Sequence, residues 1–331
     1  MQEQYEHFAK WVISQGLQDT VSIHPDDVKI MTHLDLTRKK LTELPESIAC
    51  LENLHVLKLS NNRLTKLPES IGKLKHLRNL QCENNLIEVL PKSIGKLSKL
   101  MILNLSVNKL TSLPEEFYEL RNLTRLTMAA NHLSELSTKL ENLSKLLFLS
   151  LDTNEFEMLP DAFSSMKSLY YLNLSFNHLK SLPKSISNIE ELETLLLEGN
   201  ELKDLPSLES HDMLMKLDLS DNSLSSLDFD VSALEDLKIL ILDNNFLTFL
   251  PDEVCNLEQL SYLSVSSNSL IKLPENIGNL KHLHELDIED NNIKRFPDSI
   301  CELSELKNLY MDQNNGLKKP ECLDVEFCDL D

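Results

Sequence analysis

Few residues of this chain have the types and spacing that catalysis or metal binding requires. The Gly-Lys pairs at Gly72 and Gly95 lack the rest of a phosphate-binding G-x-x-x-x-G-K-S/T loop, and neither H-E-x-x-H nor paired C-x-x-C occurs. His282 and His284 stand two apart and form at most a weak pair of metal ligands, so surface histidines are the favoured interpretation. The sequence therefore predicts a protein that is not an enzyme, with no cofactor and no metal.

A repeated run of leucines and asparagines organises the chain instead. The segment from Leu54 to Leu77 reads L-x-x-L-x-L-x-x-N-x-L-x-x-L-P-x-x-I-x-x-L-x-x-L, and this pattern recurs every 23 residues with a single step of 22. The asparagine is replaced by Lys39 in the first repeat and recurs in the others. The middle leucine falls at Leu34, Leu57, Leu80, Leu103, Leu126, Leu149, Leu172, Leu195, Leu217, Leu240, Leu263, Leu286 and Leu309. Such a period predicts a solenoid of stacked coils.

The pattern also predicts where each part of a coil lies. In Leu57-Lys58-Leu59 the period is two, so both leucines point into the core from a short strand while Lys58 points outward. An inward asparagine such as Asn62 satisfies backbone groups in the following turn, and one in each coil gives a ladder. Pro68 then disfavours a continuous helix on the convex return. The expected fold is an α/β repeat with a parallel concave sheet.

Function is then expected on the strand positions that flank the inward leucines. Aromatic and aliphatic residues gather there in two groups, with acids between and beside them, an arrangement that concentrates binding energy in protein interfaces. The alternative is that these side chains reflect strand propensity alone. The predicted partner-binding residues of the concave face are Phe148, Tyr171, Phe176, Leu196, Asp218, Ile239, Ile241, Asp243, Tyr262, Asp287 and Tyr310.

Charge is distributed unevenly along the chain. Residues 1–150 carry 19 Lys+Arg and 17 Asp+Glu, whereas residues 151–331 carry 13 and 36, so the net charge of −21 arises in the second half. This acidity disfavours nucleic acid and anionic membrane surfaces as partners, and it steers a basic protein surface toward the C-terminal half. The alternative is that the acidity only keeps a long solenoid soluble.

The cysteines favour a reducing compartment. Those in the convex segments of distant repeats are not expected to reach one another, so only Cys322 and Cys328 are left to pair, and no pair at all is the favoured interpretation. Cys82 replaces an inward leucine and is expected to be an apolar core residue. The N-terminal end lacks the cysteine cluster that usually staples the caps of extracellular repeat proteins. The remaining cysteines are Cys50, Cys255 and Cys301.

The two ends lie outside the repeat. We expect a helical cap at residues 1–30, a solenoid of about 12–13 repeats at residues 31–317, and an acidic cap or tail at residues 318–331. Apolar residues at helical spacing and the stop at Gly16 predict an amphipathic capping helix over residues 2–15. The acidic N-terminus is followed by no long apolar run, so neither a signal peptide nor membrane insertion is expected.

One region departs from the regular pattern. The step of 22 residues lies between Asn200 and Asn222, and Asp228 replaces the usual proline in the next repeat. A missing residue shortens one convex connection. We therefore predict a local irregularity or bend at residues 206–230.

The Leu-Pro-x-x-Ile-x-x-Leu segment, as at residues 67–74, resembles the intracellular leucine-rich repeats of the Ras-group or LAP type, the Shoc-2- and Scribble-like kind. Similar repeats occur in bacterial proteins, including effectors delivered into host cells. The resemblance covers about residues 31–317 and implies a horseshoe-shaped solenoid that acts as a non-catalytic adaptor. No PDZ domain and no novel-ligase domain follows, so neither of those activities is implied.

Three functions are compatible with these observations. A cytoplasmic scaffold that binds another protein is favoured. A bacterial effector that is secreted by a non-Sec route and recruits a host protein is the second, and an extracellular recognition ectodomain is the third. The oligomeric state is not predicted by the sequence.

Overall fold

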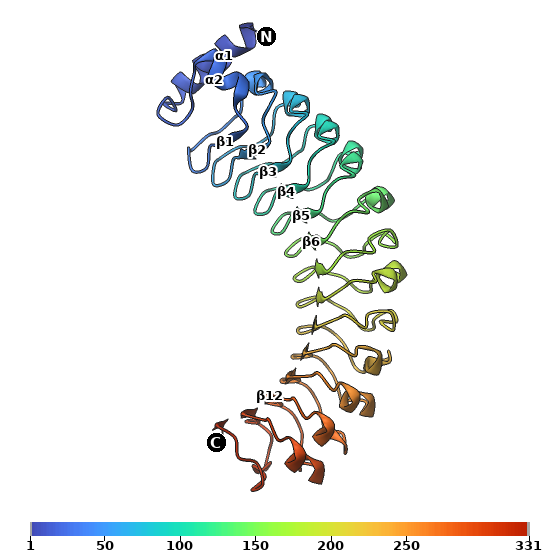
Figure 1. Ribbon diagram of the computed structural model, residues 1–331. Helices are drawn as coiled ribbons and strands as arrows, with labels where there is room; N and C mark the ends of the chain where they lie inside the picture. Colours follow the sequence, from blue (N-terminus) through green and yellow to red (C-terminus); the bar gives the residue numbers. More distant parts are fainter. Residues whose placement is uncertain (1, 330–331) are drawn as a thin grey trace. The chain divides into compact units, whose positions relative to one another are not determined.

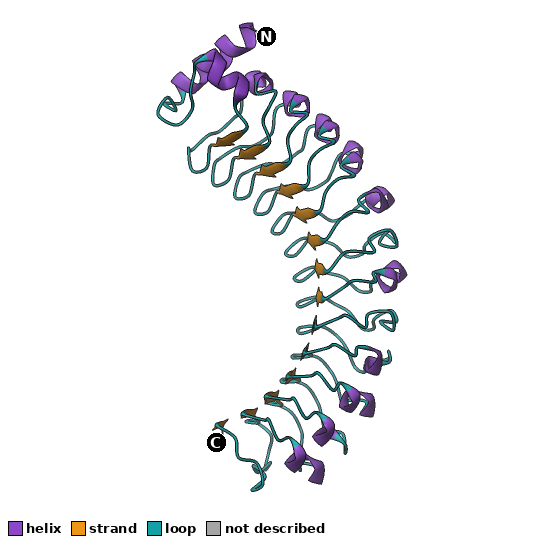
Figure 2. Ribbon diagram, viewed as in Figure 1, coloured by secondary structure: helices purple, strands orange, loops and turns teal. Residues whose placement is uncertain are grey.

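The computed structural model describes residues 2–329, and the chain divides into two compact units, Met1–Phe156 (unit 1) and Glu157–Asp331 (unit 2). Each unit is a stack of similar coils, with short strands on one wall and short helices or irregular segments on the other (Figures 1 and 2). Within each unit, every strand pairs in parallel with its neighbour in the sequence. The predicted repeat solenoid is confirmed.

Unit 1 begins with two α-helices and continues with strands that alternate with 3₁₀ helices. The α-helices are α1 (Gln2–Ser14) and α2 (Pro25–Ile30). The strands are β1 (His33–Asp35), β2 (Val56–Lys58), β3 (Asn79–Gln81), β4 (Ile102–Asn104), β5 (Arg125–Thr127) and β6 (Phe148–Ser150). The 3₁₀ helices are η1 (Glu46–Cys50), η2 (Glu69–Lys73), η3 (Lys92–Lys96), η4 (Glu115–Glu119) and η5 (Thr138–Asn142).

Unit 2 continues the same alternation. Its strands are β7 (Tyr171–Asn173), β8 (Thr194–Leu196), β9 (Lys216–Asp218), β10 (Ile239–Ile241), β11 (Tyr262–Ser264), β12 (Glu285–Asp287), β13 (Asn308–Tyr310) and β14 (Phe327–Cys328). Its 3₁₀ helices are η6 (Lys184–Asn188), η7 (Val231–Ala233), η8 (Asp252–Asn256), η9 (Ile277–Asn279) and η10 (Asp298–Glu302).

The predicted leucines form the core of both units. Each strand from β1 to β13 is centred on one of them, and leucine faces leucine across neighbouring strands, as Leu57 faces Leu80 and Leu263 faces Leu286. These four side chains are fully buried. Because the side-chain period of a strand is two, the residues on either side of each leucine point away from the core.

The predicted asparagine ladder is also present. Asn85 shows the pattern: its Oδ1 accepts the amide of Leu64 in the preceding coil at 3.0 Å, and its Nδ2 donates to the carbonyls of Leu59 and Cys82, both at 3.0 Å. The same contacts recur around Asn108. The asparagines therefore join successive coils through backbone groups that would otherwise be buried without partners.

A left-handed residue precedes almost every one of these asparagines. Asn61, Asn84 and Val107 have φ of 59°, 55° and 55°, although none of them is glycine. Left-handed backbone costs an ordinary L-residue roughly 1–2 kcal/mol. The tight turn after each strand therefore depends on the ladder to hold it.

The ends of the chain are covered by non-repeating elements. Helix α1 buries Phe8, Trp11 and Val12, with the Phe8 and Trp11 rings stacked at 5.8 Å, and the helix ends before Gly16, whose φ is 65°. At the other end, β14 pairs with β13, so residues 327–328 add a final strand to the sheet of unit 2. The predicted acidic tail thus contributes a strand, and its last two residues lie outside the described part of the chain.

The predicted irregularity at residues 206–230 is confirmed. Helix η6 ends at Asn188 and η7 begins at Val231, and the described residues between them form no helix. His211 occupies the core position that is Ile189 in the preceding repeat and Leu234 in the next, and it is completely buried. The convex segment near Phe163 also lacks a 3₁₀ helix, which the sequence pattern did not indicate.

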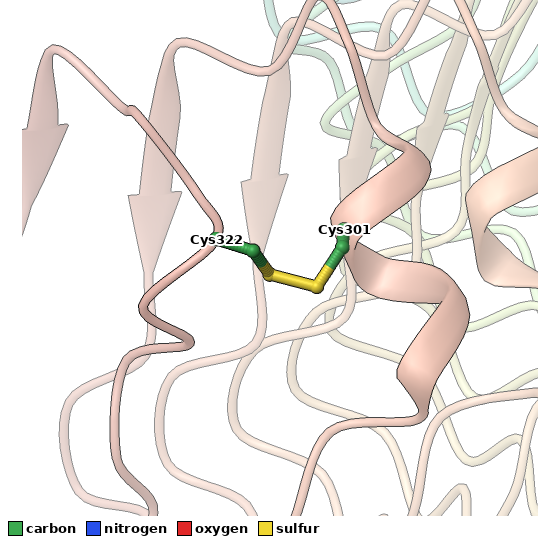
Figure 3. Close-up of a disulfide and its surroundings, with 2 residues drawn as sticks. All are labelled: Cys301 and Cys322. Carbon is green, nitrogen blue, oxygen red and sulfur yellow. A yellow bond between two sulfur atoms is a disulfide. The ribbon is translucent and has the colours of Figure 1, made fainter.

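The expectation for the cysteines is wrong in one respect. Cys301 and Cys322 form a disulfide, with Cα atoms 5.5 Å apart (Figure 3). Cys328 is a free thiol. Cys301 lies on η10, and the chain passes beside this helix one coil later. Residues about one repeat apart are neighbours in a solenoid, so a separation of 21 residues brings the two sulfurs together. Cys82 is a buried core residue, as predicted.

Candidate protein-binding face

The strand-flanking residues of unit 2 form the candidate binding face. They stand in two rows, one on either side of the inward leucines. In the first row Lys216, Ile239 and Tyr262 lie opposite one another on β9, β10 and β11. In the second row the equivalent residues are Asp218, Ile241 and Ser264.

Apolar side chains hold the middle of this face. Ile239, Ile241 and Tyr262 are half-buried, so each presents part of its surface outward from the sheet. Burial raises the pKa of the Tyr262 hydroxyl, and the Asp243 and Glu285 carboxylates add to this increase. Tyr262 is therefore a neutral hydrogen-bond donor at physiological pH, beside apolar surface and near acids.

Tyr171 and Leu196 extend the apolar surface toward the start of unit 2. Tyr171 lies opposite Thr194, and Leu196 lies opposite Asn173 and Asp218, across β7, β8 and β9. Both Tyr171 and Leu196 are half-buried.

Phe148 belongs to unit 1 and has a different environment. It lies opposite Arg125 on β5, whose guanidinium carbon is 3.6 Å from the centre of the Phe148 ring. One face of the ring is therefore covered within unit 1.

Phe176 does not stand on a strand. It follows β7 in the turn, with φ of 54°, and half of its side chain is exposed. A Cβ atom built on Gly199 would come within 2.7 Å of the Phe176 ring. The ring thus packs on a glycine of the next coil, at the edge of the face and not within it.

Tyr310 is covered in part by the end of the chain. Its ring centre lies 5.2 Å from that of Phe327, which belongs to β14. The Tyr310 side chain therefore belongs to the candidate face and also contacts the C-terminal strand of unit 2.

The acids of the face are held by hydrogen bonds. Asp218 Oδ1 accepts the hydroxyl of Ser220 at 2.7 Å, and Asp243 Oδ1 accepts the Ser264 hydroxyl and the Ser266 amide at 2.5 and 2.8 Å. Burial raises the pKa of Asp243 despite these bonds, which lower it. Asp218 is 8% exposed and Asp243 is half-buried, so Asp243 presents more of its carboxylate outward than Asp218 does.

A second acidic group lies near the C-terminal end. The pKa of Asp287 is raised by burial and by the charges of Asp243 and Asp329. The pKa of Glu289 rises to about 7, first because its side chain hydrogen-bonds to Asp329, then through burial and nearby acids. Neighbouring carboxylates repel one another when ionised, and a nearby cation favours their ionised form.

The described residues offer no group of three or more His, Cys, Asp or Glu that could hold a metal ion. His282 and His284 both approach one carboxylate, that of Glu305, at 3.2 and 3.6 Å. The pair noted in the sequence therefore takes part in exposed ion-pair contacts.

Three exposed apolar residues were not identified from the sequence. Phe246, Phe249 and Ile271 are 63%, 50% and 62% exposed, and they lie on the segments that follow β10 and β11. For Phe246 a signal was present, because the position after the repeat asparagine is polar in most other coils, as at Lys109 and His132, and apolar in one, at Leu86.

Two family matches cover most of the chain. The family described as leucine-rich repeat region matches residues 16–105, 69–159 and 252–324, and the family described as leucine rich repeat matches residues 144–202 and 212–270. The chain belongs to the leucine-rich repeat family. No curated protein was matched.

Solved structures of other leucine-rich repeat proteins are similar. One from Leptospira interrogans is 30% identical, with 89% of this chain and 93% of that chain covered and a TM-score of 0.67. PEPR1 in the PEPR1-AtPEP1 structure is 28% identical, with a TM-score of 0.72, and 88% of this chain matches 46% of that one. An internalin of Listeria monocytogenes is 22% identical, covers 87% and 89%, and has a TM-score of 0.68, which shows the shared fold alone.

These matches support a repeat protein of the kind that generally binds other proteins. They do not distinguish the Ras-group or LAP subgroup from other leucine-rich repeats. Among residues 2–329, no helix is long and apolar enough to cross a membrane.

Proposed function

We propose that this leucine-rich repeat protein is a non-catalytic scaffold or adaptor that binds another protein through the strand-flanking face of unit 2. One observation carries the proposal: half-buried Ile239 on β10 lies in register with half-buried Tyr262 on β11, with Ile241 two residues along β10 and the hydrogen-bonded Asp243 nearby. A rigid strand wall presents such side chains at low entropic cost, and apolar anchors with a polar rim are what protein interfaces use.

Charge supports a partner with a basic surface. Residues 157–331 carry 34 Asp+Glu against 13 Lys+Arg, whereas residues 1–156 carry 19 of each. The pKa values of Asp243 and Asp287 are raised chiefly by burial and that of Glu289 by its hydrogen bond to Asp329, and neighbouring acids add to each increase. A Lys or Arg side chain near them offsets this added repulsion. Complementary charge of this kind mainly increases the rate of association and the specificity.

An unbiased pull-down with matched variants tests the proposal. Ile239→Ala, Tyr262→Ala and Tyr171→Ala should each weaken binding of the captured partner by about 1–3 kcal/mol while the fold is retained. Ile271→Ala is the control, because it makes the same truncation at an exposed site off the strands. If the three face variants capture the same proteins as the wild type, or if Ile271→Ala loses them equally, the face is not the binding site.

A second candidate function, extracellular recognition, is favoured by the disulfide. Cys301 and Cys322 are both exposed, and a disulfide persists mainly in oxidising compartments. This observation runs against the cytoplasmic location expected from the sequence. Alkylation of whole cells before lysis, followed by reduction and a second alkylation, decides between the two: oxidised Cys301 and Cys322 support an extracytoplasmic protein, and reduced ones a cytoplasmic scaffold.

A further inference from the structure

A basic surface lies on unit 1, along the side of the coils where the chain enters the strands, and it is outside the candidate binding face. Arg78, Met101, Thr124 and Leu147 occupy the same position in consecutive coils, just before the strands. Backbone hydrogen bonds join them, since the amides of Met101, Thr124 and Leu147 donate to the carbonyls of the residues 23 positions earlier at 2.8, 2.8 and 2.9 Å. The four side chains are thus held side by side along the edge.

A second row stands beside the first. Lys99, Asn122 and Lys145 each precede a member of the first row by two residues, and the Lys145 ammonium donates to Asn122 Oδ1 at 2.7 Å. The two rows enclose an open hollow of about 360 Å³. We call its lining the basic edge: Arg78, Lys99, Met101, Asn122, Thr124 and Lys145.

The cations of the basic edge have no acidic partner. Among the described residues, no carboxylate lies within 4.0 Å of Arg78, Lys99 or Lys145, and several acids of unit 1 pair with other cations, as Glu116 does with Lys92. Positive potential extends to His55, whose pKa is lowered by desolvation and then by the charges of Arg78 and other neighbours.

The basic edge is a property of these coils and not of the repeat itself. Two repeats after Lys145 the same position is Glu191, and two repeats after Leu147 it is Glu193. The overall charge of −21 therefore conceals a local surface of opposite sign. At physiological salt, charges more than about 8 Å away are largely screened, so the local sign governs what binds.

We propose that the basic edge is a second binding site, which takes a protein segment that presents both acidic and apolar residues on one face. Arg78, Lys99 and Lys145 supply the cations for its carboxylates. Met101 and Leu147 are 42% and 38% exposed and lie between and beside these cations, so they provide apolar contact at the intervening positions. The Asn122 amide is engaged by the Ser98 carbonyl and the Lys145 ammonium, and the Thr124 hydroxyl donates to the Met101 carbonyl. The Thr124 oxygen keeps the capacity to accept a hydrogen bond from the segment's backbone.

Two other polyanions fit the basic edge less well. The six lining residues include no aromatic ring, which single-stranded nucleic acid needs for base stacking. A sulfated polysaccharide matches the charge but has no apolar groups to cover Met101 and Leu147. The presence of apolar side chains beside the cations therefore favours a protein segment.

Fluorescence anisotropy with a labelled peptide tests the proposal. The probe is a peptide of about eight residues with the pattern Glu-Glu-Leu-Leu, which presents Glu and Leu on the same face when extended. It extends roughly 26 Å and spans the three strand spacings of the edge, about 14 Å. We expect saturable binding that weakens at high salt, and at least a tenfold loss of affinity in the double variant Lys99→Glu/Lys145→Glu. Replacement of Glu by Gln, or of Leu by Ser, in the probe should each reduce binding.

The control is the double variant Lys73→Glu/Lys96→Glu, which makes the same charge change on η2 and η3 of the same unit. It should bind the probe within about twofold of the wild type after correction for long-range charge. Absence of peptide binding, equal losses in the two double variants, or preferential binding of dextran sulfate or DNA would each overturn the proposal. Because the basic edge lies outside unit 2, none of these outcomes affects the test of the candidate binding face.

Discussion

The guanidinium carbon of Arg125 lies 3.6 Å from the centre of the Phe148 ring, across the paired strands β5 and β6. A cation held over an aromatic face is attracted by the ring quadrupole. Phe148 consequently stabilises the sheet of unit 1, and it offers less free surface than its sequence position suggested. For binding, Tyr262 and Ile239 are the sharper probes.

The Arg125–Phe148 pair should be measurable in a double-mutant cycle. Arg125→Ala and Phe148→Ala should show a coupling energy of about 0.5–1 kcal/mol in urea unfolding, because each substitution removes the same contact. Arg121→Ala with Phe148→Ala is the control cycle, since Arg121 pairs with Glu119 instead. Equal coupling in both cycles would show that the contact contributes nothing specific.

Asn85→Ala should open the coil locally. The substitution leaves the Leu64 amide buried without a partner, at a cost of about 1–3 kcal/mol, whereas the Leu59 and Cys82 carbonyls keep the bonds from Asn62 and Asn108. The measurement is hydrogen exchange at the Leu64 amide, which should become faster by two orders of magnitude or more. Asn256→Ala, on the exposed side of η8, should leave it unchanged. Unaltered exchange in Asn85→Ala would contradict a structural role for the ladder.

The repeat explains why so much of the fold was predictable. The residues equivalent to Leu57 and Asn62 occupy the same structural positions in successive coils. Their repeated spacing therefore specifies the strands, the core and the asparagine ladder. The capping helix was also predictable from the sequence, because the apolar side chains on one face of α1 can be buried only against the open end of the stack. Periodic features are local patterns, and local patterns are visible in a sequence.

What escaped prediction depends on contacts between coils. Cys301 pairs with Cys322 because the chain returns beside η10 one coil later, a relationship that the distance along the sequence does not display. The covering of Phe148 by Arg125 and the packing of Phe176 on Gly199 arise in the same way. Whether a strand-flanking residue is free or covered depends on its neighbours, so the binding roles remain proposals.

The C-terminal end of unit 2 should be tighter at low pH. The pKa of Glu289 is raised to about 7 by its hydrogen bond to Asp329, against 4.5 for the free group, so the folded state retains a proton that the unfolded state loses. The stabilisation is complete below about pH 4.5 and disappears as pH rises through 7.

Hydrogen exchange at the Met311 amide, which donates to Asp329 at 2.8 Å, reports this change. After correction for intrinsic rates, protection should fall between pH 5 and pH 8 in the wild type and stay level in Glu289→Gln, which keeps a donor without the charge. Glu326→Gln serves as the exposed control. Equal pH dependence in Glu289→Gln and the wild type would rule out this pair as the cause.

The buried His211 should produce the opposite pH dependence in the middle of unit 2. Its ring is fully buried, with Nδ1 and Nε2 each 3.2 Å from a carbonyl, those of Leu208 and Ile186, and burial lowers its pKa below 6.5. The unfolded state therefore binds a proton first, so stability is complete above pH 6.5 and is lost as pH falls through the folded-state pKa. His211→Leu, which restores the residue type of the neighbouring coils, should abolish this acid-side loss in urea unfolding at pH 5, whereas the surface variant His178→Leu should retain it. An acid-side loss of the same size in His211→Leu would mean that other groups cause it.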